Sequence, residues 1–307
     1  MVGFPQTGAP SGRASRPASA PWVHRTPDGI EIGAEQPSGE LEGPVTSLLR
    51  ALLTTYHVRK TLWVLVLKDF KSRYRAQALG LIWSFAYPLV MMVTITVAFD
   101  HILKVPIKNF PIFYLIAAMF WQWFSNGLMA STGTFINDAP LVKKTTFPRF
   151  LLPVANVLAN GINFLMEWLL VILFYFVFPD AYRFNITLVA LPLLVLIEFV
   201  LLVGLGLATS TMNVRYRDVF YLVTSAITIG FWASPILYST DMAPGWLRTI
   251  LRLNPLSGVM EGARAILMQG RWPDPIHIAM DAGIALLVFI IGCMIFRSQN
   301  LRLSDYV

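Results

Sequence analysis

The chain has 307 residues, of which 56% are hydrophobic and only 13% are charged, and its formal net charge is +7. A soluble domain carries about 25% charged residues, so this composition argues against a soluble enzyme and against a nucleic-acid-binding domain. The single cysteine, Cys293, excludes an intrachain disulfide, and the four histidines are too scattered to suggest a metal site.

The N-terminal part of the chain has the composition of an unfolded segment. Residues 1–44 contain seven Pro and seven Gly and no apolar run. Such a segment cannot bury enough apolar surface to offset the entropy lost on ordering. We therefore predict a disordered cytosolic extension over residues 1–57 and a single membrane domain over residues 58–307.

The next segment, residues 61–79, has the pattern of an amphipathic helix. A helix with basic residues opposite an apolar face is typical of one that lies in the headgroup plane of a membrane. The alternative is an ordinary amphipathic helix packed on cytosolic protein. We favour the interfacial helix because it runs directly into the first apolar stretch. The apolar face contains Trp63, Leu67, Phe70 and Tyr74, and the basic face contains Lys68, Lys71 and Arg75.

Six long apolar stretches then follow, and all 24 Lys and Arg residues lie outside them. A helix needs about 20 apolar residues to cross the roughly 30 Å core of a bilayer. A Lys or Arg at mid-membrane costs roughly 2.5–3.5 kcal/mol, which explains the exclusion. We predict an all-α membrane protein with six transmembrane helices. The stretches are residues 80–99, 112–133, 150–178, 186–212, 219–238 and 278–296.

The distribution of basic residues predicts the orientation. If the N-terminus is cytosolic, the segments expected inside carry 13 Lys and Arg after His57, against 7 in the segments expected outside. Because cytosolic loops are enriched in Lys and Arg, we predict that both termini are cytosolic. The same residues are placed to contact anionic lipid headgroups.

Polar residues inside the apolar stretches are candidates for function. In the third stretch, Asn156, Asn160, Asn163 and Glu167 recur at helical spacing and form one polar stripe. Such a stripe either joins neighbouring helices or lines a hydrated passage, and the sequence leaves both open. Two further acids are Glu198, near mid-depth, and Asp281, near the outer end of the sixth stretch, where we expect headgroups.

Two connections between the stretches are distinctive. The short basic loop at residues 137–149 is either a plain positive-inside loop or a docking surface built on its apolar Leu141 and Val142. The longest connection, residues 239–277, carries helix signals: Asn254 as N-cap, Pro255 at the first helical position and Gly270 as a stop. We predict two short helices there, at or dipping into the outer leaflet.

Several catalytic and nucleotide-binding signatures are absent from the sequence. It contains no Gly-Lys pair and hence no Gly-x-x-x-x-Gly-Lys phosphate loop, no His-Glu-x-x-His, no Asp-x-Asp and no Gly-x-Ser-x-Gly. We therefore expect a protein that is not an enzyme and that binds no cofactor itself.

An ordered set of short motifs resembles the permeases of type-2 ABC exporters for polysaccharide and polyol phosphate. Each motif is weak alone, and the specificity lies in their order along residues 68–270. They are Lys-Asp-Phe-Lys-Ser-Arg-Tyr-Arg at 68–75, Leu-Gly-Leu-Ile-Trp at 79–83, Pro88-Leu89, Asn-Asp-Ala-Pro-Leu-Val-Lys-Lys at 137–144, Phe-Pro-Arg at 147–149, Arg-Tyr-Arg-Asp at 215–218, Ser234-Pro235, and Asn-Pro-Leu-Ser-Gly at 254–258 with Glu261 and Arg264.

The resemblance implies roles for particular residues. The ATPase-coupling segment would comprise Asn137, Asp138, Ala139, Pro140, Leu141, Val142, Lys143, Lys144, Phe147, Pro148 and Arg149, with a second cytosolic contact at Arg215, Arg217 and Asp218. The gate helix would carry Trp63, Lys68, Phe70, Lys71, Arg73, Tyr74 and Arg75. The outer re-entrant gate would use Asn254, Pro255, Glu261 and Arg264, and the passage lining would include Asn156, Asn160, Asn163, Glu167 and Glu198.

The resemblance also implies partners and cargo. It implies a homodimer in the bacterial inner membrane, with a separate ATPase subunit that binds ATP and Mg under each copy. The cargo would be a lipid-linked glycan such as O-antigen, teichoic acid or galactan. The alternatives are a drug or small-lipid exporter of the same superfamily, a proton-driven secondary transporter using Glu167 or Glu198, a membrane scaffold, and an enzyme acting on lipid-linked sugars.

Overall fold

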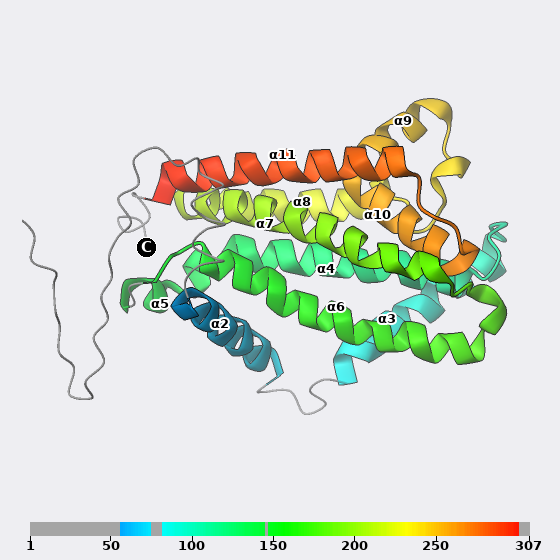
Figure 1. The fold of residues 1–307 in the computed structure, drawn as a ribbon, viewed down its shortest axis with the longest axis horizontal. Coiled ribbons are helices and arrows are strands. Elements are labelled where there is room, and N and C mark those ends of the chain that lie inside the picture. The colour runs from blue at the N-terminus through cyan, green and yellow to red at the C-terminus, as the bar shows by residue number, and fades with distance from the viewer. Residues whose placement is uncertain (1–55, 75–81, 145–146, 301–307) are drawn as a thin grey trace, which may run out of the picture. The chain divides into compact units, whose positions relative to one another are not determined.

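The computed structural model describes residues 56–74, 82–144 and 147–300, and within this part every regular element is helical (Figure 1). The extension predicted over residues 1–57 lies outside the described residues, except for Tyr56 and His57, which begin the first helix. The helices are α2 (Tyr56–Tyr74), α3 (Ile82–Thr96), α4 (Phe110–Asn137), α5 (Ala139–Lys144), α6 (Leu151–Val177), α7 (Leu191–Arg215), α8 (Asp218–Ala233), α9 (Gly245–Leu253), α10 (Pro255–Arg264) and α11 (Pro275–Asn300). Turns of π-helix, Val97–Ile102 and Ala265–Gln269, follow α3 and α10, and 3₁₀ turns lie at Pro179–Ala181, Ile186–Ala190 and Thr240–Met242.

Four helical segments of the described chain are long and apolar enough to cross a membrane. They match the first, third, fourth and sixth predicted stretches. Their surfaces carry many exposed large apolar side chains, such as Phe176 and Leu287, as expected for contact with lipid. The four segments are Ile82–Ile102, Leu151–Val177, Ile186–Arg215 and Pro275–Gln299.

The second and fifth predicted stretches form α4 and α8, which are not among these four segments. The reason differs between the two helices. Helix α4 is long, but it carries Gln122, Asn126 and several hydroxyl residues, and it packs against α3, α6, α7, α8 and α10. Its apolar side chains therefore bury against protein. Helix α8 ends at Ala233, earlier than the Tyr238 end that we predicted. Pro235 disfavours the helical conformation of the residue before it, and Ser234 is extended (φ −105°, ψ 151°).

The connections gather at two ends of the bundle (Figure 1). Helix α5 and the α7–α8 corner lie at one end, and α9 and α10 lie at the other. The predicted helix signals are present in α10: the Asn254 Oδ1 accepts a hydrogen bond from the Leu256 N–H at 3.1 Å, and Pro255 occupies the first position. The helical run ends at Gly270 in the left-handed conformation (φ 64°).

Helices α7 and α11 approach until their backbones touch. A methyl group added at Gly292 would lie 2.0 Å from the Gly204 carbonyl oxygen, and one added at Gly204 would lie 2.6 Å from the Phe289 Cα. Small residues allow such close approach between membrane helices, where van der Waals packing drives association. The two glycines therefore set the separation of the two helices.

A buried guanidinium joins α10 to the rest of its end of the bundle. Arg264 is 1% exposed, and its three nitrogens donate hydrogen bonds to the carbonyl oxygens of Phe113 (3.0 Å), Pro235 (2.6 Å) and Ile236 (2.9 Å). Its guanidinium carbon also lies 3.4 Å from the centre of the Phe113 ring.

An acid one turn away completes this cluster. The Glu261 carboxylate lies 3.5 Å from Arg264 and accepts a hydrogen bond from the Thr240 N–H at 2.9 Å. Burial lowers the pKa of the Arg264 guanidinium to about 10, although the Glu261 carboxylate acts in the opposite direction. The guanidinium is therefore protonated at neutral pH and holds α10, the start of α4 and the segment after α8 together.

The glycine contact predicts a specific effect of Gly292→Ala. The added methyl group meets backbone and forces α11 away from α7, which we expect to lower the free energy of unfolding by about 1–3 kcal/mol. The measurement is denaturant titration of the purified chain in detergent micelles. The control is Gly283→Ala on the same helix, where an added methyl group meets nothing within 4 Å; equal destabilisation by both substitutions would contradict the packing argument.

The Arg264 cluster predicts a larger effect for Arg264→Met. This substitution leaves three buried carbonyls without their donor and Glu261 without its cation, so we expect a loss of about 3–5 kcal/mol in the free energy of unfolding. Arg252→Met on α9 is the control, because Arg252 is exposed and should change stability by less than about 0.5 kcal/mol. The same titration compares the two variants.

Candidate functional site

Helix α2 packs against α6 through a face that differs from the predicted apolar face. Leu65 and Val66 are the buried residues of α2, whereas Trp63 is 58% exposed. The α2 helix also begins earlier than predicted, at Tyr56; the predicted end at residue 79 lies outside the described residues, as does Arg75. The deviation arises because Arg73, which is paired with Asp69 on α2, finds a polar partner in Asn160 of α6.

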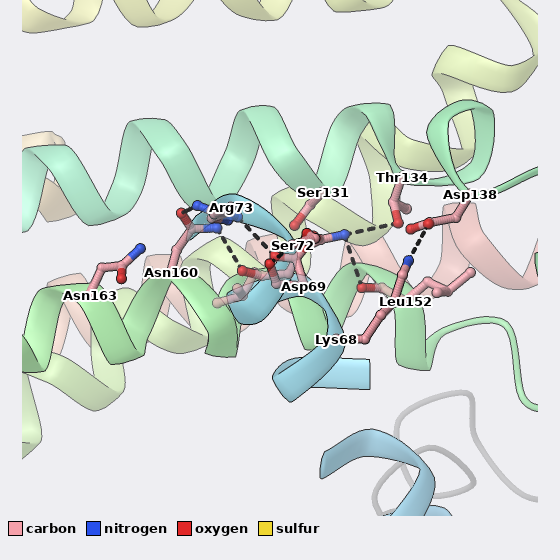
Figure 2. Close-up of polar contacts among 12 residues, drawn as sticks. Lys68, Asp69, Ser72, Arg73, Ser131, Thr134, Asp138, Leu152, Asn160 and Asn163 are labelled. Carbon is pink, nitrogen blue, oxygen red and sulfur yellow. Dashed lines mark hydrogen bonds and ion pairs between the residues drawn. The ribbon is translucent and has the colours of Figure 1, made fainter. Parts of the chain in front are cut away.

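These polar partners belong to the stripe predicted on α6 (Figure 2). Arg73 donates to the Asn160 Oδ1 at 2.5 Å and to the Asp69 carboxylate, one turn earlier, at 2.9 Å. One residue further along α2, the Tyr74 hydroxyl donates to the Asn163 Oδ1 at 2.6 Å and lies 2.8 Å from the Ser84 Oγ of α3. The stripe therefore joins α2 to α6.

A second set of contacts fixes the same helix to the end of α4. Lys68 of α2 forms an ion pair with Asp138, the C-cap of α4 (Figure 2). On α6, the Asn156 amide donates to the Thr134 Oγ1 of α4 at 2.9 Å and to the Leu152 carbonyl at 3.2 Å. Helices α2, α4 and α6 are thus connected by side-chain hydrogen bonds at this end.

The remaining predicted residues of α2 are at the surface or pack locally. Lys71 is exposed. The Phe70 ring is half-buried and lies 5.1 Å from the Tyr74 ring, centre to centre. Neither residue contacts the stripe through a hydrogen bond in the described part of the chain.

A polar cavity of about 400 Å³ lies between α2, α3, α4 and α6. Its lining combines three aromatic rings with three side-chain amides and two ionisable groups. Aromatic faces and amides are the groups that contact sugar rings and hydroxyls. The lining residues are Arg73, Tyr74, Trp83, Ser84, Tyr87, Pro88, Gln122, Asn126, Asn163 and Glu167.

The polar stripe of α6 therefore divides along its length. Asn156 and Asn160 only join helices, Asn163 both bonds to α2 and lines the cavity, and Glu167 lines the cavity. Glu167 is 6% exposed, and its Oε2 has no hydrogen-bond partner among the described residues. Glu198 does not line this cavity; it is fully buried on α7, and neither carboxylate oxygen has a partner in the described part of the chain. The structure therefore separates these two acids.

Asp281 does not lie where we expected it. Instead of facing headgroups, it is 1% exposed and lies against Gly258 of α10, where a methyl group would come within 1.7 Å of its Oδ2. Helix α10 therefore packs closely against α11 at Gly258. The sequence gives no sign of this contact, because the two residues are far apart along the chain.

The predicted coupling segment contains a short helix in its described part. Asn137 ends α4, Asp138 caps it, and residues 139–144 form α5, within which Ala139 and Pro140 occupy the first turn. Leu141 and Val142 are half-buried against the core, whereas Lys143 is exposed. The side chain of Lys144 lies outside the described residues. The segment continues through Phe147, Pro148 and Arg149 into α6, where the Pro148 carbonyl accepts from the Leu151 N–H at 3.1 Å.

The second predicted contact lies at the corner between α7 and α8. Arg215, Arg217 and Asp218 are all exposed there, and the Arg215 guanidinium lies 5.1 Å from the centre of the Tyr216 ring. This corner and α5 lie at the same end of the bundle (Figure 1). The four residues predicted for the outer gate lie at the opposite end: Glu261 and Arg264 form the ion pair of the cluster described above, and Asn254 and Pro255 begin the same helix, α10.

Sequence reasoning did not propose six residues of the cavity as site residues: Trp83, Ser84, Tyr87 and Pro88 on α3, and Gln122 and Asn126 on α4. Among them are the pairs Trp83 and Tyr87, and Gln122 and Asn126. Each pair is separated by four positions, which places both members on one helical face. The two amides at this spacing, within a stretch rich in apolar residues, could have indicated a polar site in the sequence.

Comparison with known proteins agrees with these features. Residues 60–268 match the ABC-2 type transporter family. The chain is 31% identical over 243 residues to the O-antigen export system permease protein RfbA of Klebsiella pneumoniae, covering 79% of this chain and 93% of that protein. It is 27% identical to the protein of the same name from Myxococcus xanthus (85% and 100% covered). It is 21% identical to the polysialic acid transport protein KpsM of Escherichia coli (80% and 96% covered). The motifs, the helical membrane fold and these matches together establish that the chain belongs to the ABC-2 type transporter family, as a membrane permease subunit.

Proposed function

We propose that this chain is the membrane subunit of an ATP-driven exporter that carries a lipid-linked polysaccharide across the bacterial inner membrane. The relatives named for O-antigen and polysialic acid indicate this class of cargo. Galactan is the member of the class that we propose to assay first.

The observation that carries the proposal is the cavity between α2, α3, α4 and α6. Its rings and amides suit a polyhydroxylated chain, and a cavity for an apolar drug would not need three amides. The cavity is also bounded by α2, which the resemblance assigns as the gate helix. Cargo that enters beside α2 would therefore meet Arg73 and Tyr74, the lining residues that α2 contributes.

The energy would come from a second protein. The sequence has no phosphate-binding loop, so ATP and Mg would bind to a separate ATPase subunit. We propose that the ATPase grips α5 and the exposed corner at residues 215–218, and that two copies of the permease form the passage with two ATPases. This arrangement requires six spans and cytosolic termini, with α4 and α8 as the second and fifth spans and α9 and α10 as the outer gate.

The side-chain contacts suggest how movement of α5 would reach the cavity. Helix α5 is continuous with Asp138, which is paired with Lys68 of α2. Helix α2 in turn contacts Asn160 and Asn163 of α6 through Arg73 and Tyr74. A displacement of α5 by the ATPase would shift α2 relative to α6, and it must favour one of two packings to open the passage.

Reconstitution tests the proposal. The chain should co-purify with an ATPase, and vesicles containing both should accumulate lipid-linked glycan only with ATP and Mg. Transport by the chain alone along a proton gradient would overturn the proposal in favour of the secondary transporter. ATP-driven transport of drugs or small lipids without glycan transport would overturn the cargo assignment.

The coupling assignment predicts the effect of Lys143→Glu/Lys144→Glu. Charge reversal should reduce the amount of co-purified ATPase and ATP-dependent export by about tenfold or more, because each like-charge contact at an interface is unfavourable by several kcal/mol. The matched control is Lys104→Glu/Lys108→Glu, which makes the same charge change between α3 and α4. Unchanged export in the first variant would remove the coupling role of α5.

The cavity predicts a difference between two substitutions of Tyr87. Tyr87→Leu removes the ring, and because an aromatic contact contributes about 0.5–1.5 kcal/mol, export should slow by about 2- to 12-fold. Tyr87→Phe retains the ring and should retain most of the export rate. The measurement is the initial rate of ATP-dependent glycan accumulation in the same vesicles. Equal rates for the two variants would show that Tyr87 does not contact the cargo.

A further inference from the structure

An apolar groove of about 480 Å³ runs between α2, α6 and α7, apart from the polar cavity. Every residue that lines it is apolar, and it shares no lining residue with the cavity. Trp63 and Val66 contribute from α2, Gly161 and Leu165 from α6, and Leu196 and Phe199 from α7. Water has no polar partner in such a groove, so a hydrocarbon occupant is favoured.

The groove opens toward lipid. Trp63, Leu165 and Leu196 are 58%, 63% and 54% exposed at its rim. Both α6 and α7 belong to the helical segments that are long and apolar enough to cross a membrane. Hydrocarbon chains of the bilayer are therefore adjacent to the groove.

Two cations stand at one end of the groove. Arg59 and Lys60 precede Trp63 by four and three residues on α2, which places them on the same helical face, about one turn or 5.4 Å away. Both are exposed, and within the described part of the chain neither forms an ion pair or a hydrogen bond through its side chain. Their free donors can bind a phosphate.

A phosphate site beside an apolar groove has the chemistry of an anionic phospholipid. The lipid-linked cargo is less well suited, because its polar chain must reach the amides of the cavity, whereas the groove has no polar lining. We propose that the α2–α6–α7 groove binds one acyl chain of an anionic phospholipid, with the lipid phosphate on Arg59 and Lys60. The site does not depend on the identity of the exported cargo.

Lipid binding to the full chain tests this site. The chain is purified in mild detergent and titrated with dioleoyl phosphatidylglycerol or dioleoyl phosphatidylcholine, and native mass spectrometry counts the retained lipids. We expect one phosphatidylglycerol to be retained more strongly than phosphatidylcholine. Arg59→Gln/Lys60→Gln should abolish this preference, lowering retention of phosphatidylglycerol about tenfold or more, since each cation near the headgroup contributes to binding.

A pair of matched substitutions locates the acyl chain. Leu196→Trp fills the groove at an exposed position and should reduce retention of both lipids. Leu193→Trp is the control, because Leu193 is exposed on the same helix but does not line the groove. Equal retention by these two variants, or unchanged phosphatidylglycerol retention after loss of both cations, would overturn the proposal. Recovery of a polyprenyl-linked glycan from the native membrane preparation, lost specifically in Leu196→Trp, would overturn it in favour of the cargo.

Discussion

The arrangement of the α10 end depends on one charge held by backbone carbonyls. Helix α8 stops at Ala233, which leaves the carbonyls of Pro235 and Ile236 outside any helix, and the Arg264 guanidinium takes both. An unpaired carbonyl in an apolar environment is costly. The break after α8 therefore needs the donors of Arg264, and the buried guanidinium needs these carbonyls as acceptors. The third bond, to Phe113, adds the start of α4. Three segments distant in sequence are thereby fixed by a single side chain.

The opposite end uses many weaker polar contacts instead of one buried charge. Lys68 pairs with Asp138, Arg73 and Tyr74 contact the α6 amides, and Asn156 contacts Thr134. Several of these groups are partly exposed, so each bond is easier to break than those of Arg264. The difference in burial agrees with a bundle whose α10 end is rigid and whose α5 end can rearrange.

Much of the helical fold could be predicted from residue types alone. Exclusion of Lys and Arg located a helix in each of the six stretches, four of them in segments long and apolar enough to cross a membrane, and Asn254-Pro255 with Gly270 located α10 and its end. The effect of Pro235 on α8 was also present in the sequence, but hydropathy across residues 234–238 masked it. These features could be predicted because each depends on residues within the same stretch of sequence.

The candidate site was harder to predict because its residues meet through tertiary packing. Which residues of the α6 stripe join helices and which line the cavity depends on where α2 crosses α6. The buried face of α2 in turn depends on polar partners that lie about 90 positions away. The sequence places Asp281 near the end of a span, where headgroups are expected, but the packing of α10 against α11 buries it. Gln122 and Asn126 become candidate site residues only because aromatic rings of α3 line the same cavity.

Helix α6 lines both the polar cavity and the apolar groove. Asn163 and Glu167 line the polar cavity, whereas Gly161 and Leu165 line the apolar groove. A helix is only about 10 Å across, and it moves as a rigid rod over a few turns. A tilt of α6 that widens the groove therefore narrows the cavity, and a tilt in the opposite direction does the reverse. The thickness and lateral pressure of the surrounding bilayer would thus act directly on the volume of the polar cavity.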